Sequence, residues 1–328
     1  MAGESGSALS DPPGPGWFAR AGDSDTFASF KASKVAVAAA AVTALLFLLA
    51  LLAPLLSPQD PFDPAQLELI NSRLPPIWTL GASWPFLHAT ADGQWPFLLG
   101  TDDQGRDILS AILYGLRVSI LVGFLGVLFS ATLGILAGLI AGYVGGAVDA
   151  AIMRVADVQL TFPAILIALL IDGVVKSVMG SRITTTAILA VLIASIGLSF
   201  WVQYARTVRG SVMVEKNKDY VQAARLIGLS SPVIMVRHVL PNVIGPVFAI
   251  ATINFALAII TEATLSFLGS GMPDTQPSLG TLIRIGNRYL FSGEWWIVAF
   301  PGATLVLLVL AVNLLGDWLR DALNPRLQ

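Results

Sequence analysis

Four stretches of this chain run for about 20 residues or more without a charged side chain. They are 35–56, 118–144, 183–205 and 295–316. A helix rises about 1.5 Å per residue, so about 20 apolar residues cross the roughly 30 Å hydrocarbon core of a bilayer. Only 12% of the side chains are charged, whereas a soluble domain carries about 25%. The sequence therefore predicts an integral membrane protein.

Two further apolar stretches complete the predicted spans. The stretch 158–175 contains Asp172, and Lys176 follows four residues later, where the two can pair on one helix face. The stretch 243–268 is apolar except for Glu262. A carboxylate at a helix centre costs about 2.5 to 3.5 kcal/mol, so Glu262 should have a protein partner or a wet cavity. A structural hydrogen bond to neighbouring backbone is favoured over contact with a solute. The predicted fold class is all-α with six transmembrane helices.

The distribution of lysine and arginine predicts the orientation. The loop 206–242 alone carries six of the 19 cations, so it is placed in the cytoplasm together with both termini. The segment 57–117 then lies outside, and 118–328 forms a core of five spans. The tail 1–34 is rich in Gly, Pro, Ser and Asp and is predicted to be disordered. Its end, from Phe27 to Lys34, could form an interfacial elbow.

The residues that a catalytic site would need are scarce in this chain. There is no cysteine, and the two histidines, His88 and His238, lie outside the spans, away from any membrane-embedded serine. The phosphate-binding pattern G-x-x-x-x-G-K-[ST] does not occur. We expect no catalytic, cofactor or metal site here, and a net charge of −2 gives no indication of nucleic-acid binding. If ATP drives this protein, another chain must hydrolyse it.

Glycines recur every four residues in the second span, at Gly134, Gly138 and Gly142. In lipid such spacing lets two helix backbones approach closely. The stripe predicts helix packing and says little about function.

The loop 206–242 is expected to contain two short helices. The first, 219–227, begins with an acid and ends at Gly228, a favourable residue for the left-handed turn after a helix. Ser231 is expected to cap the second, with Pro232 at its first position, and Pro241 stops or restarts it. Apolar or small residues lie at helical spacing on the first helix: Tyr220, Ala223, Ala224 and Ile227. That face could enter a groove of a partner or pack on its own bundle, and the pattern leaves both open.

The loop resembles that of the permease subunits of bacterial ABC importers for dipeptides, oligopeptides and nickel, specifically the second permease of each pair. Their signature is E-A-A, three residues, Gly, nine residues, then I-x-L-P. It aligns with Gln222-Ala223-Ala224, Gly228 and His238-Val239-Leu240-Pro241. Gln222 replaces the acid and His238 stands in place of Ile, while Asp219, one turn away, could supply a charged contact. Further segments each resemble a segment of the family, in the same order along the chain: 98–123, 141–163, 265–269 and 313–326.

The resemblance implies a subunit of an ATP-driven importer in the bacterial cytoplasmic membrane, with the loop as a coupling element. Its expected ATPase contacts are Asp219, Tyr220, Gln222, Ala223, Ala224, Gly228, His238, Leu240 and Pro241. The implied partners are a second homologous permease, ATP-binding subunits that hold ATP and Mg, and an extracytoplasmic solute-binding protein. A secondary transporter or channel would favour inverted repeats and midplane acids, and a scaffold would not explain the loop spacing. Neither the substrate nor the pore-lining residues can be predicted.

The segment 57–99 is longer than the family leads us to expect. It carries Trp78, Trp84 and Trp95, which lie among Pro75, Pro76, Pro85 and Pro96. Interfacial tryptophan beside proline favours a rigid loop at headgroup level over recognition of the binding protein.

Overall fold

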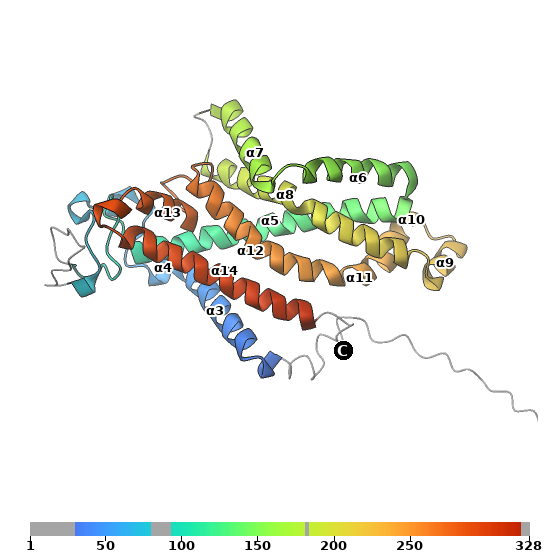
Figure 1. The fold of residues 1–328 in the computed structure, drawn as a ribbon, viewed down its shortest axis with the longest axis horizontal. Coiled ribbons are helices and arrows are strands. Elements are labelled where there is room, and N and C mark those ends of the chain that lie inside the picture. The colour runs from blue at the N-terminus through green and yellow to red at the C-terminus, as the bar shows by residue number, and fades with distance from the viewer. Residues whose placement is uncertain (1–29, 80–92, 181–183, 323–328) are drawn as a thin grey trace, which may run out of the picture.

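A computed structural model describes residues 30–79, 93–180 and 184–322 as an elongated helical bundle (Figure 1). Among these residues, five helices are long and apolar enough to cross a membrane, and a sharply bent pair, α6 with α7, makes a sixth span if counted as one. The five are α3 (Lys34–Leu51), α5 (Ile108–Val144), α8 (Thr185–Glu215), α12 (Gly245–Phe267) and α14 (Trp296–Ala322). No β-strand occurs in the described part of the chain. The all-α class and the number of spans agree with the prediction.

The bent pair corrects the expected helix over 158–175. α6 (Gly146–Leu160) ends before Pro163, and α7 (Ala164–Met179) continues at 92° to it. Proline has no N–H for the helix ladder and disfavours helical backbone in the residue before it, so the chain breaks at 161–163. The predicted pair on α7 is present: Lys176 Nζ lies 2.9 Å from Asp172 Oδ2.

Two spans are longer than the apolar stretches that predicted them. α5 begins at Ile108, where the Asp107 carboxylate caps the helix by accepting a hydrogen bond from the N–H of Ser110 at 2.7 Å. α8 continues to Glu215, so residues 206–215, expected in the loop, are helical. The predicted stretches are bounded by charged side chains, Arg117 before the second span and Arg206 after the fourth, and both helices continue past these charges.

The glycine stripe of α5 packs directly on α8, as predicted. A Cβ at Gly134 or Gly138 would lie 2.5 or 2.4 Å from a backbone carbonyl oxygen of α8, and one at Gly142 would lie 2.8 Å from the Val212 Cβ. Real Cβ atoms do not approach so closely, so side chains larger than hydrogen would force the helices apart. α12 packs against both α5 and α14, and α3 packs on α14.

The outer segment folds over one end of the bundle through 3-10 turns: η1 (Pro64–Gln66), η2 (Leu69–Asn71) and η3 (Ile77–Thr79). It is joined to α14 by the Trp296 indole N–H, which donates to the Thr101 carbonyl at 3.3 Å. Trp78 packs edge-on against Phe300, while Trp95 is exposed. Trp84 and His88 lie outside the described residues, as does the predicted tail up to residue 29.

Candidate functional site

The loop 206–242 is anchored to the bundle by ion pairs at its start. Arg209 makes a bidentate contact with Asp149 of α6, with N···O distances of 2.5 and 2.6 Å, and Arg206 Nη2 lies 2.6 Å from Asp157 Oδ1. Lys216 Nζ donates to the Gly142 carbonyl at 2.6 Å and so satisfies a free acceptor at the end of α5. The end of α8 is therefore held against both neighbouring helices.

The first loop helix, α9, spans Asp219–Leu226 and buries one face. Val221 and Ala224 are buried in a cluster with Tyr143 of α5 and Val208 and Val212 of α8. Ala223 points outward and is exposed. The expectation that Ala223 and Ala224 share one contact face is therefore wrong, because adjacent residues lie about 100° apart around a helix of 3.6 residues per turn.

The turn after α9 has the predicted geometry. Gly228 has φ +83°, in the left-handed region that glycine adopts without strain. The N–H of Gly228 donates to the Arg225 carbonyl at 3.0 Å, and the N–H of Leu229 donates to that of Ala224 at 3.2 Å. These two bonds form a Schellman motif, which satisfies the last carbonyls of α9. The motif fixes the direction in which the chain leaves the helix.

The second loop helix differs in detail from the prediction. α10 (Ser231–Val233) has Ser230 as its N-cap instead of Ser231, and the Ser230 side chain accepts no capping hydrogen bond. Residues Ile234–Val239 form a π-helical turn, and α11 (Leu240–Val243) follows directly. Pro241 cannot follow an unbroken α-helix because its ring meets the carbonyl four residues earlier. The wider π turn accommodates it, so Pro241 changes the helix type without ending the helix.

Tyr220 joins the three parts of the loop. Its hydroxyl donates to Glu215 Oε1 at 2.6 Å at the end of α8, and it accepts from Asn242 Nδ2 at 3.0 Å in α11. The Asn242 amide also donates to the His238 carbonyl at 2.8 Å. Burial, reinforced by the Glu215 carboxylate, raises the pKa of Tyr220 above its usual range, so the phenol keeps its proton. The loop is thus a braced unit.

Sequence reasoning missed Glu215, Asn242 and Tyr143 as members of this site. Tyr143 lies beneath α9, with the Arg225 guanidinium carbon 5.1 Å from its ring centroid. Glu215 and Asn242 flank the two loop helices, and their only sequence signal is polarity at a helix end. Tyr143 is 82 residues from Arg225, so no local pattern could have connected them.

The remaining predicted residues fall into two groups. Asp219, Gln222, Ala223 and Pro241 are exposed, whereas His238 and Leu240 are half-buried. Beside the exposed group lie large apolar side chains that no part of the described chain covers: Leu226 (89% exposed), Ile227 (75%), Val233 and Val236. We name Asp219, Gln222, Ala223, Leu226 and Ile227 the α9 outer face. Exposed apolar side chains gathered in this way are typical of an interaction site.

Glu262 has the protein partners that its position requires, although they are not backbone groups. Its carboxylate is fully buried and accepts from the hydroxyls of Ser119 at 2.8 Å and Ser266 at 2.7 Å. Ser119 also accepts from the N–H of Leu279, the first residue of α13 (Leu279–Asn287). The expected backbone bond is therefore corrected to a hydroxyl cluster that joins α5, α12 and α13.

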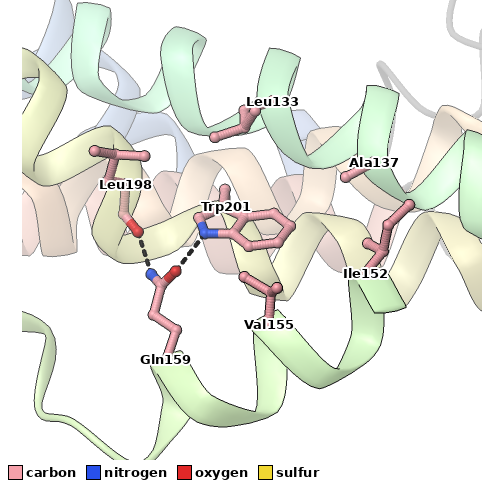
Figure 2. A pocket seen from close by; sticks show the side chains of 7 residues that line it. All are labelled: Leu133, Ala137, Ile152, Val155, Gln159, Leu198 and Trp201. Carbon is pink, nitrogen blue, oxygen red and sulfur yellow. Dashed lines mark hydrogen bonds between the residues drawn. The ribbon is translucent and has the colours of Figure 1, made fainter. Parts of the chain in front are cut away.

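A pocket of about 340 Å³ lies between α5, α6 and α8 (Figure 2). Its lining is apolar except for Gln159, whose amide N–H donates to the Leu198 carbonyl and whose oxygen accepts from the Trp201 indole at 2.6 Å. Because both amide atoms are occupied, the pocket offers a bound solute few free polar groups. Gln159 therefore holds α6 to α8.

Comparisons with known proteins match most of the chain. Residues 134–328 match the family model "Binding-protein-dependent transport system inner membrane component", and 24–76 match "N-terminal TM domain of oligopeptide transport permease C". The Di/tripeptide transport system permease protein DppC of Pseudomonas aeruginosa (strain UCBPP-PA14) is 38% identical over 81% of each chain. The Dipeptide transport system permease protein DppC of Escherichia coli (strain K12) is 39% identical over 81% of this chain and 82% of its own.

A solved structure of the MetNI methionine ABC transporter in inward-facing conformations is similar in fold. The TM-score is 0.51 at 18% identity, and the match covers 65% of this chain and 96% of the other. This likeness extends to the arrangement of helices and no further.

Proposed function

The chain belongs to the family of binding-protein-dependent transport system inner membrane components, and from that premise we propose that α9 is where it couples to a separate ATPase. It is a permease subunit of an ABC importer and a multi-pass protein of the bacterial inner membrane. ATP and Mg are bound and ATP is hydrolysed on partner subunits. The loop 206–242 and both termini lie in the cytoplasm.

The observation that carries the coupling role is the pairing of a braced helix with an exposed apolar face. Val221 and Ala224 fix α9 to α8, and Tyr220 fixes it to α11. Leu226 and Ile227 are left facing outward. A helix held on one side and bare on the other can transfer movement from a partner to the spans as a rigid body. Asp219 on the α9 outer face can supply the acidic contact that Gln222 does not.

The proposed solutes are dipeptides and other short peptides. The support is that the relatives at 38 to 39% identity carry names for di- and tripeptide or dipeptide transport. Together with an extracytoplasmic solute-binding protein, this subunit would deliver peptides to a pathway shared with a second permease.

The second permease is proposed to cover α7. This helix leaves the bundle at 92° to α6 and has exposed apolar residues along one side, at Leu166, Leu170, Val174 and Val178. These residues recur every four positions and so form one stripe. A homologous subunit of the same architecture could bury that stripe and thereby complete the translocation pathway.

The coupling role can be tested by placing a charge on the α9 outer face. Leu226→Asp should abolish copurification of the ATPase and ATP-dependent peptide uptake, because an aspartate would be desolvated in the interface. Val214→Asp is the matched control, since Val214 is also exposed, at the end of α8. It should keep the ATPase bound. Both variants should insert into the membrane normally.

The adjacent alanines separate docking from internal packing. Ala223→Trp should block ATPase binding in a loop that stays folded, whereas Ala224→Trp should overpack the cluster beneath α9, at a cost of about 1 to 3 kcal/mol. Normal ATPase association and uptake with Ala223→Trp and Leu226→Asp would refute docking through α9.

A further inference from the structure

A groove of about 340 Å³ runs between α3 and α14, starting at the first residue of α3. Residues 34–42 of α3 and 307–314 of α14 form its walls. Every lining side chain is apolar except Lys34, which stands at the mouth. We name it the Lys34 groove. The volume lies within the range of about 300 to 1,000 Å³ that is usual for small-molecule sites.

The groove exists because small residues meet where the two helices face each other. Ala38 and Ala39 of α3 lie opposite Ala311 of α14, and larger side chains such as Val35 and Leu310 stand exposed beside them. A flexible apolar chain could lie along the alanine residues, between the larger side chains on either side. Such a shape suits an acyl chain better than a second helix, which needs a wider surface.

The dimensions fit one leaflet of a bilayer. The eight residue steps from Lys34 to Val42 correspond to about 12 Å along the helix axis, against roughly 15 Å for half of the hydrocarbon core. Phe30 and Trp318 pack edge-to-face at the same end, with ring centroids 4.8 Å apart. Tryptophan is enriched at the headgroup level. Lys34 is therefore at the depth of lipid phosphates.

We propose that the Lys34 groove binds one anionic phospholipid, with an acyl chain between α3 and α14 and the phosphate at the Lys34 ammonium. Charge complementarity selects the headgroup, because a lysine near the surface favours an anionic lipid by about fivefold. None of its lining residues belongs to the coupling loop 206–242.

The same helix pair provides an internal comparison. Farther along α3, a second groove of about 280 Å³ is lined by residues of α3, α5 and α14, including Leu46, Leu116 and Leu307, and none of its lining residues is charged. A lipid bound there gains apolar contacts but no ion pair. It should show no preference for anionic headgroups.

The test uses the assembled transporter in nanodiscs of phosphatidylglycerol and phosphatidylcholine with identical acyl chains. Native mass spectrometry after release from the discs counts the retained lipids of each kind. The unmodified transporter should retain phosphatidylglycerol about fivefold over phosphatidylcholine. Lys34→Gln should reduce that ratio to about one, while Lys34→Arg keeps it. Arg117→Gln, which removes an exposed cation from α5, away from the groove, is the control and should also keep it.

Filling the groove tests the acyl-chain part of the proposal. Ala38→Leu should lower retention of both lipids, and a photoreactive residue at position 310 should cross-link to lipid. Cross-linking to the second permease instead would overturn the proposal. So would an unmodified transporter without headgroup preference, a preference that survives Lys34→Gln, or displacement of phosphatidylglycerol by inorganic phosphate, which would indicate a simple anion site.

Discussion

At the scale of single residues, the buried carboxylates Glu262, Asp172 and Asp102 each have polar partners close by. Glu262 gathers hydroxyls from α5 and α12, and Asp172 pairs with Lys176 on α7. Asp102, in the outer segment, accepts from the backbone N–H groups of Gln104 and Arg106 at 2.8 and 2.9 Å. Burying a carboxylate away from water costs free energy, and these hydrogen bonds and ion pairs offset part of that cost.

Glu262→Gln is expected to destabilise the folded protein without changing which solutes are imported. Both carboxylate oxygens accept from serine hydroxyls, and an amide offers one acceptor and one donor, so one serine must reorient. The loss should be about 1 to 3 kcal/mol, measured as a lower thermal midpoint of the purified complex. Ser119→Ala should give a loss of similar kind. A changed range of transported peptides at normal assembly would show instead that Glu262 contacts solute.

The outer segment should become less stable as pH rises from about 4 to about 6. Burial raises the pKa of Asp102 to about 6 from 3.8, against the opposing effect of Arg106. The folded segment therefore holds this proton more tightly than the unfolded one, and its stability is greatest below the unfolded value and declines through the folded value. Hydrogen exchange of residues 57–79 and 93–107, corrected for intrinsic rates, should show faster opening at pH 7 than at pH 5.

Asp102→Asn provides the control for that pH dependence. It should remove most of the difference and leave a smaller part, since burial also raises the pKa values of Asp107 and Glu294. Equal protection at both pH values in the unmodified protein would contradict the account.

At the scale of elements, what could be predicted depended on how local the determining contacts are. The turn at Gly228 follows from the backbone of one residue, and Gly134, Gly138 and Gly142 indicate packing by spacing alone. The break at Pro163 is just as local, but the apolar stretch around it predicts a single span over 158–175. The rotation of α9 about its axis is different, because Tyr143, Val208 and Val212 determine which alanine is buried. Those contacts are distant in sequence. The 92° angle at Pro163 is likewise fixed by packing of α7 on α8.

Gly228→Val should impair coupling through backbone strain alone. Nothing lies within 4 Å of a Cβ built at this position, so sterics with neighbours do not contribute. A β-branched residue at φ +83° is unfavourable by about 1 to 2 kcal/mol. We expect reduced ATPase copurification and uptake with normal membrane insertion. Gly228→Asn should be much milder, since asparagine tolerates the left-handed region, and equal effects from both would argue against strain.

At the scale of the whole molecule, one bundle carries three separable surfaces. The outer segment covers one end, the α9 outer face lies at the other, and α7 projects from the side (Figure 1). Loop charge alone predicted which end faces the cytoplasm, and family resemblance predicted the coupling role.

The orientation can be checked with single cysteines, because the chain contains none. Lys218→Cys is a suitable site, since its side chain is exposed, whereas Lys216 is occupied at the end of α5. An impermeant maleimide should leave Lys218→Cys unlabelled in intact cells and label it after permeabilisation. Ile70→Cys, exposed in the outer segment, should react in intact cells. The reverse pattern would invert the topology.

The direct contact of α5 with α8 has a mechanical consequence. α5 has 37 residues and is therefore about 55 Å long, well beyond the roughly 30 Å apolar layer. Because glycine has no side chain, α5 lies directly against α8 at Gly134, Gly138 and Gly142. The two helices should therefore tilt together as one rigid body. A tilt of about 5° around its midpoint would swing each tip by roughly 2 Å in opposite directions. A force applied to α5 beside Gly142 would therefore move the other end of the helix, at Asp107, in the opposite direction through rigid rotation alone.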